Sequence, residues 1–269
     1  MKIIYLLLLL VGCYRSPHIE YPIDKFDINQ KYVSAIEGNM PVLLVVSHSG
    51  KLTFTNIMER KDDNESCNYN VNNDLYTDDI AFKLSDILYK KYNKRPYIII
   101  NHIHRKYLDL NRSKSCSYED DKLEKVYDEF HMKIKDLTTK IKSTYGDGLL
   151  IDVHGQVKYE GDVFIGVRDN RTLNSSLNGK FISRLFSNRG YIAQPDSHWR
   201  GGFIVEKYGM QMGYRIYSSQ ALSWKLNAFQ IEIDEKYRYS DEYNKDAVRY
   251  RFCWDFADII MDILKKLDL

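Results

Sequence analysis

The chain has 269 residues and a mass of 31.8 kDa, long enough for one large domain with a substantial core. Its 39 Lys and Arg residues nearly balance its 37 Asp and Glu residues. The overall charge therefore gives no reason to expect nucleic acid or an anionic membrane surface as a partner, and local groups of residues must carry the function.

The N-terminus has the pattern of an export signal. One lysine precedes a short apolar run that ends at Gly12, too short to span a bilayer. The segment Leu10–Cys13 resembles a bacterial lipobox, whose cysteine becomes the lipidated first residue; otherwise it is the end of a cleaved signal peptide. We predict a signal over residues 1–13, an N-terminal extension over 14–40 and one domain over 41–269. The protein is expected to be exported, either secreted or anchored at the cell surface or in the periplasm through a lipid on Cys13.

Apolar runs and helical periodicities alternate along the rest of the chain. In chain order, the expected elements are a strand over Val42–Val46, a helix over Thr77–Tyr92, a strand over Tyr97–Asn101, a helix from about Asp120 to Ser143, strands over Leu149–Val153 and Val163–Val167, a helix over Ser176–Asn188, a strand over Ala228–Ile233 and a helix over Asp241–Leu267. Strands separated by helices predict a three-layer α/β fold, in which a mixed, mostly parallel sheet carries helices on both faces.

Polar side chains follow three of these strands at the point where each strand ends. His48 follows the first strand, and His154 ends the third. Arg105 and Arg112 follow the second. Ligands of open α/β sheets bind at this edge, where two histidines could hold a metal ion and two arginines an anionic substrate. The pattern predicts a metallohydrolase.

A catalytic zinc site needs three protein ligands and an open position for water, so a carboxylate must complete the pair of histidines. Glu59, in the loop that leaves the first histidine, is the predicted third ligand, and Asp62 and Asp63 compete with it. Asp152 precedes His154 by two residues on the same side of the strand, where it could orient that histidine.

Glu232 lies inside an apolar strand, where a buried acid is costly unless it has a partner or a function. It could be the general base that takes a proton from water, or it could form a buried ion pair with one of the arginines. Arg112 could bind a carboxylate at two points, with Asn111 as a further donor. The alternative is that Arg105 and Arg112 tie their loop to nearby acids.

The sequence is compatible with two states of the cysteines at 67 and 116. Cys67 and Cys116 both lie in polar loops and could form a disulfide in an exported protein, while free thiols fit the sequence equally well. Cys253 lies in the apolar pattern of the last helix and is expected in the core.

Taken in order, these motifs resemble the N-formylglutamate amidohydrolase family. They are His-Ser-Gly at 48–50, Arg followed by Asp-x-Asn-Arg within 105–112, Asp-x-His-Gly at 152–155 and Gln-x-Glu at 230–232. The family is similar to the zinc carboxypeptidases and to the aspartoacylase and succinylglutamate desuccinylase group. The resemblance implies a zinc-carboxypeptidase-like fold and a catalytic domain over 41–269. By this resemblance, Zn²⁺ is held by His48, Glu59 and His154, the scissile carbonyl is polarised by Arg105, the substrate carboxylate is bound by Asn111 and Arg112, and water is activated by Glu232.

The chain departs from this pattern in two ways. Lys51 stands where the carboxypeptidases have the acid of their His-x-x-Glu pair. The export signal also differs from formylglutamate breakdown, which belongs to cytoplasmic histidine catabolism. We therefore expect an exported zinc amidohydrolase whose substrate is an N-acyl amino acid or a peptide with a free carboxylate. A carboxypeptidase or γ-glutamyl-polymer hydrolase with the same site stays open, as does a metal-free lipoprotein that binds an anion on this fold.

Overall fold

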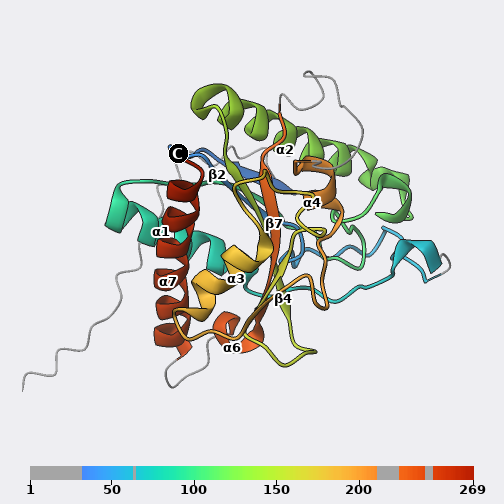
Figure 1. The fold of residues 1–269 in the computed structure, drawn as a ribbon. Coiled ribbons are helices and arrows are strands. Elements are labelled where there is room, and N and C mark those ends of the chain that lie inside the picture. Colours follow the sequence, from blue (N-terminus) through green and yellow to red (C-terminus); the bar gives the residue numbers. More distant parts are fainter. Residues whose placement is uncertain (1–31, 63–64, 211–223, 240–244) are drawn as a thin grey trace, which may run out of the picture.

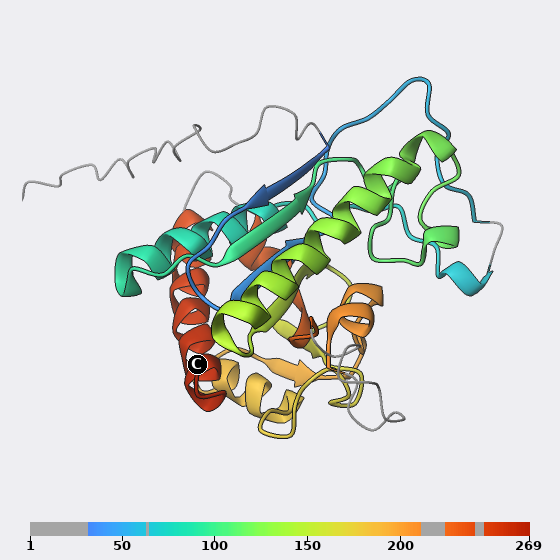
Figure 2. The same ribbon diagram turned by 90° about the horizontal axis from the view of Figure 1, so that it is seen from above.

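The computed structural model describes residues 32–62, 65–210, 224–239 and 245–269. The predicted signal, including Cys13, and the candidate ligand Asp63 lie outside these residues. The described chain forms a seven-stranded sheet between two layers of helices (Figures 1 and 2). None of its helices combines the length and the apolar character that crossing a membrane requires.

The strands of the sheet are β1 (Val33–Ile36), β2 (Val42–Val46), β3 (Tyr97–Asn101), β4 (Leu149–Gln156), β5 (Val163–Gly166), β6 (Ala193–Pro195) and β7 (Asn227–Asp234). The α-helices are α1 (Thr77–Tyr92), α2 (Glu124–Tyr145), α3 (Gly179–Ser187), α4 (Phe203–Tyr208), α6 (Glu235–Arg238) and α7 (Lys245–Lys266). Short 3₁₀ turns cover Glu65–Cys67, Lys114–Cys116 and Asp121–Leu123.

The strand order is β1-β3-β2-β4-β7-β5-β6. β2 is parallel to β3 and β4, β4 is parallel to β7, and β5 is parallel to β6. β1 is antiparallel to β3, and β5 is antiparallel to β7. The predicted three-layer fold with a mixed, mostly parallel sheet is confirmed.

Alternate residues of the central strands face different helix layers. Leu44 and Ile151 belong to the core under α1, α3 and α7, which also contains Cys253 as predicted. Leu43 and Leu150 belong to the core under α2 and α4. Because the sheet is buried on both faces, β2 and most of β3 are continuous apolar runs, and this pattern is what predicts them from the sequence.

The face under α2 and α4 becomes polar where β4 and β7 approach their carboxyl ends. Asp152 and His154 continue the row that begins with Leu150, since every second residue of a strand faces the same side. Glu232 continues the row of Ala228 on β7 in the same way. The fold thus delivers buried polar side chains to one edge of one face.

Several elements were not predicted from the sequence. β1 lies within residues 14–40, expected to be an extension, and forms one edge of the sheet. The three-residue β6 and the six-residue α4 carry no clear periodicity. β2, α1 and β3 have the predicted bounds.

Candidate metal centre

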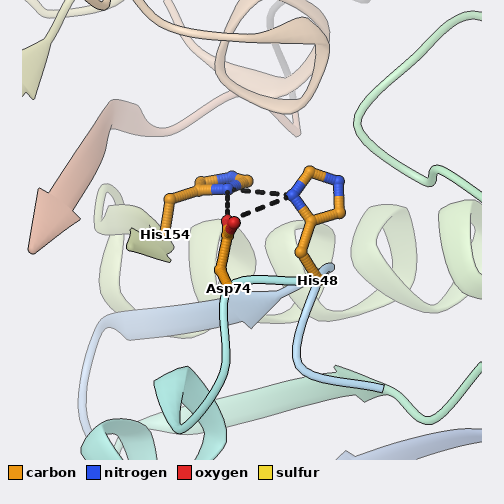
Figure 3. Close-up of side chains that lie close together, drawn as sticks. All are labelled: His48, Asp74 and His154. Carbon is orange, nitrogen blue, oxygen red and sulfur yellow. Dashed lines mark hydrogen bonds and ion pairs between the residues drawn. The ribbon is translucent and has the colours of Figure 1, made fainter. Parts of the chain in front are cut away.

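Three side chains from separate segments point toward one another at this edge. His48 follows β2, His154 lies near the end of β4, and Asp74 lies in the loop before α1. Their ligand atoms lie within 4.8 Å of one another, and all three residues are buried. Figure 3 shows both imidazole rings beside the Asp74 carboxylate. We call these three residues the metal group.

Hydrogen bonds fix the orientation of both imidazole rings. Asp74 Oδ2 lies 3.2 Å from His48 Nδ1 and 2.8 Å from His154 Nδ1, and the two Nδ1 atoms lie 3.1 Å apart. The opposite nitrogens contact buried carboxylates. His48 Nε2 lies 2.7 Å from Asp109 Oδ1, and His154 Nε2 lies 3.0 Å from Asp152 Oδ2. A histidine that ligates a metal commonly donates its second N–H to such a carboxylate, so the predicted orienting role of Asp152 fits these contacts.

This donor set fits a divalent cation. When the Nε2–H of each ring donates to its carboxylate, a bound cation displaces the protons that the Nδ1 atoms share with Asp74, and two Nδ1 lone pairs and an Asp74 oxygen then face one another. A positive charge among them relieves their repulsion. Histidine nitrogens with a carboxylate oxygen also form catalytic zinc sites that keep one position open for water.

The surrounding charges also favour a cation at this point. Burial alone would raise the pKa of Asp74, but hydrogen bonds from His154 and His48 lower it well below its ordinary value. Burial alone would lower the pKa of His154, but Asp152 and Asp74 raise it well above its ordinary value. The carboxylates around the metal group therefore stabilise positive charge between them.

Glu59, the predicted third ligand, does not lie with the histidines. Its side chain is 55% exposed and forms an ion pair with Lys106 at 2.6 Å. Asp62, one of the alternatives, is also exposed. The expected third member is thus corrected from Glu59 to Asp74.

Glu232 lies next to the metal group on the same face of the sheet. It is in register with His154 on one side and with Phe164 on the other. Its carboxylate accepts a hydrogen bond from Gln230 Nε2 at 2.7 Å. Burial raises the pKa of Glu232 to about 8, against the lowering effect of the His154 charge and with a further contribution from Asp74. A carboxyl group that titrates near neutrality can both accept and release a proton, as general acid–base chemistry requires.

Arg105 contacts two of the carboxylates at the metal group. Its Nε donates to Asp109 Oδ2 at 2.9 Å, and its Nη1 lies 3.8 Å from Asp74 Oδ1. Burial alone would lower the pKa of Arg105, but these two carboxylates raise it. Arg105 therefore makes the contacts to nearby acids that the sequence left open as its alternative role, and its role in polarising a scissile carbonyl stays a prediction.

Asn111 is fixed between the sheet and α4. Its Nδ2 donates to Asp152 Oδ2 at 3.2 Å and lies 3.0 Å from His154 Nε2. Its Oδ1 accepts a hydrogen bond from the backbone N–H of Ile204 at 2.8 Å. Gly202 permits this approach, because a Cβ there would lie 2.5 Å from Asn111 Nδ2. Asn111 thus lies beside the metal group, and its role in binding a substrate carboxylate stays a prediction.

Arg112 binds backbone oxygen atoms of a neighbouring loop. Its Nε donates to the oxygen of Cys67 at 2.9 Å, and its Nη2 donates to that of Asn68 at 2.8 Å. Its Nη1 donates to the oxygen of Asn111 at 2.9 Å. A disulfide joins Cys67 to Cys116, which settles the choice between a bridge and free thiols. Arg112 therefore connects the disulfide loop to the site, and its role in binding a substrate carboxylate stays a prediction.

A fully buried arginine connects the segments that carry the site. Arg238 Nε donates to the oxygen of Ile233 at 3.0 Å, Nη1 to that of Leu75 at 2.6 Å, and Nη2 to that of Gln156 at 3.2 Å. These three oxygens lie within two residues of the buried glutamate, the aspartate and the second histidine of the site. Gly155 makes room for the guanidinium, since a Cβ there would lie 2.2 Å from Arg238 Cζ.

Comparison with known proteins identifies the fold. No protein-family model matches the sequence, and no curated protein matches it. The crystal structure of N-formylglutamate amidohydrolase from Ralstonia eutropha aligns with a TM-score of 0.61 at 13% identity, over 86% of this chain and 98% of that chain. The chain has the N-formylglutamate amidohydrolase fold. The gene product Atu2144 from Agrobacterium tumefaciens aligns with a TM-score of 0.59 at 13% identity, over 89% of this chain and 97% of that chain. The predicted resemblance is confirmed at the level of the fold.

Two acids of this site were not predicted from the sequence. Asp74 lies far along the loop that follows His48, and its backbone N–H donates a hydrogen bond to the backbone oxygen of His48 at 3.0 Å. The sequence feature that could have indicated Asp74 is its position three residues before the start of α1. Asp109 belongs to the Asp-x-Asn-Arg motif, but no sequence pattern indicates its contact with His48.

Proposed function

We propose that this chain is an exported zinc-dependent hydrolase that cleaves an amide bond in a substrate with a free carboxylate. Such a substrate is an N-acyl amino acid such as N-formylglutamate, or a peptide. The observation that carries the proposal is the metal group with Glu232 beside it on one face of the sheet. The fold shared with N-formylglutamate amidohydrolase supports amide chemistry.

Each residue of the site has a separate role in the proposed reaction. His48, Asp74 and His154 would hold the zinc ion, which would supply Lewis-acid activation when bound. Glu232 accepts the proton of the attacking water at its carboxylate and delivers it to the leaving nitrogen. The Arg105 guanidinium stabilises the negative charge that develops on the carbonyl oxygen, and it does so strongly because the site is buried.

Asn111 and Arg112 bind the substrate carboxylate in this proposal. A guanidinium has five N–H groups, and Arg112 donates three of them to backbone oxygens. Its remaining donors suit a carboxylate better than a single ammonium would. A carboxypeptidase or a γ-glutamyl-polymer hydrolase would use the same residues, so the substrate range separates these activities. A non-catalytic lipoprotein would purify without zinc.

The variant Glu232→Gln tests the chemistry, because it keeps the shape of the side chain and removes the proton acceptor. We expect unchanged zinc content and melting temperature, with turnover lower by at least about 100-fold. The matched control is Glu235→Gln, an exposed position three residues along the chain that should retain parental turnover. Turnover of Glu232→Gln within a few-fold of the parent would exclude Glu232 as the base.

Export is the second part of the proposal. The Cys67–Cys116 disulfide supports it, because disulfides form and persist mainly in oxidising compartments outside the cytosol. The lipobox-like segment that ends at Cys13 points to a lipid anchor.

Cell fractionation tests the anchor. Expressed in a bacterium that processes lipoproteins, the protein should sediment with membranes, and Cys13→Ser should release it or leave it unprocessed. If both forms are equally soluble outside the cytoplasm, the chain is secreted without an anchor. If both stay in the cytoplasm, the export proposal is wrong.

A further inference from the structure

Four aromatic side chains from two loops and one strand pack together next to Glu232. Tyr159 and His198 stack with ring centroids 3.8 Å apart. Trp199 packs against Tyr159 at 5.0 Å and against Phe164 at 5.1 Å. We call Tyr159, Phe164, His198 and Trp199 the aromatic patch.

The strand register places this patch on the face of the sheet that carries the metal group. Phe164 on β5 lies directly opposite Glu232 on β7, which lies opposite His154 on β4, so the three side chains form one row. The loop that carries Trp199 continues to Gly202, whose N–H donates to Gln230 Oε1 at 2.6 Å. The patch therefore flanks the site on the β5 side.

The aromatic patch remains partly open to solvent. Phe164 is buried beneath the other rings, Tyr159 and Trp199 are half-buried, and His198 is exposed. A formyl group is too small to cover such a surface. An aromatic ring can stack on it, and stacked or edge-to-face rings attract one another beyond the burial of their area.

Arg112 and the aromatic patch lie on opposite sides of the metal group. Their positions indicate which part of a bound substrate would carry an aromatic ring. Arg112 lies on the β2 side, 3.9 Å from Asp109, which contacts His48. The aromatic patch lies on the opposite, β5 side. A substrate whose carboxylate is at Arg112 therefore directs its acyl group toward the patch.

We propose that the aromatic patch is a subsite for the acyl group, so that the preferred substrates are N-aroyl or other ring-bearing N-acyl amino acids. This inference rests on the proposed amide hydrolysis.

The test compares N-benzoylglutamate with N-formylglutamate in the zinc-loaded full chain. We expect the parent to favour the benzoyl substrate in kcat/KM. Trp199→Ala should lower kcat/KM for the benzoyl substrate by about 10-fold, mostly through KM, and change that for the formyl substrate by less than about 2-fold. Tyr159→Ala should act in the same direction if Trp199→Ala fails to fold. The control is Trp254→Ala, a partly exposed tryptophan of α7 on the other helix layer, which should change neither substrate.

A binding measurement separates failure of the subsite from failure of the proposed function. Calorimetric titration of N-benzoylglutamate is made into Glu232→Gln, with and without Trp199→Ala. If Trp199→Ala weakens this binding and the parent chain hydrolyses neither substrate, the subsite is supported and the hydrolase is contradicted. Turnover of both substrates with equal efficiency, unaffected by Trp199→Ala, would overturn the subsite and leave the hydrolase standing. Absence of both turnover and binding would overturn both.

Discussion

Asp74 decides at the residue scale whether this chain can hold a metal ion. Its Oδ2 lies between the Nδ1 atoms of His48 and His154, and its carboxylate stays ionised because hydrogen bonds from both rings hold its pKa low. Two imidazoles alone provide too few fixed donors for a catalytic zinc site.

The variant Asp74→Asn should therefore lower zinc affinity by more than about 100-fold, beyond the range observed for residues behind the ligands. Its amide keeps the size of the side chain but loses the charge. Glu59→Gln is the matched control, since Glu59 is exposed and forms its ion pair with Lys106, and it should keep parental affinity. Competition with a chromophoric chelator measures the zinc affinity of both variants. A reversed order, with Glu59→Gln losing zinc and Asp74→Asn keeping it, would restore the ligand set predicted from the sequence.

The histidines of this site could be predicted from the sequence, whereas its acids could not. His48 and His154 each follow an apolar run within three residues, Val42–Val46 and Leu149–Ile151, so their place at the sheet edge follows from the strand pattern. Asp74 comes 26 residues after His48, and the path of that loop depends on tertiary contacts. Proximity in sequence favoured Glu59, which the loop carries out to solvent.

At the scale of the elements, Arg238 holds three segments in the arrangement that the metal group needs. Its guanidinium donates to backbone oxygens of β7, of the end of β4 and of the loop before α1. Lysine at this position could not reach all three oxygens at once, because its donors lie on one atom.

Arg238→Lys is thus predicted to lower zinc affinity by about 10- to 100-fold, the range seen when groups that orient metal ligands are changed. Ile260→Ala, in the core between α7 and the sheet, controls for loss of stability without contact to the site. At equal loss of melting temperature, only Arg238→Lys should bind zinc more weakly. Equal affinities in the two variants would make Arg238 a general stabilising residue.

The sequence predicts the type of an element correctly where a strand is buried on both faces. The prediction fails where the element is short. β2 and β3 are uninterrupted apolar runs with the predicted bounds. β6 has only three residues, all half-buried, so no pattern marks it. The antiparallel pairing of β5 with β7, which brings Phe164 beside Glu232, depends on tertiary packing rather than on local pattern.

At the scale of the whole molecule, a network of arginines and one disulfide connects the long loops to the sheet. Arg60 donates to the backbone oxygens of Asn70 and Arg105, at 2.9 and 3.3 Å, and lies 3.6 Å from Asp109. With the disulfide, these contacts fix the segment that ends in Asp74. The loops thus complete on one face of the sheet a site that no single element contains.

The central claim is that the metal group and its neighbours hydrolyse amide bonds, and removal and return of the metal test it most directly. Mass spectrometry measures amino-acid release from a panel of N-acyl amino acids and short peptides by the chelator-treated protein, before and after addition of stoichiometric Zn²⁺. We predict release only after zinc is restored, and only from substrates with a free carboxylate. Equal release by the metal-free protein, or no release by protein that has bound zinc, would contradict the claim.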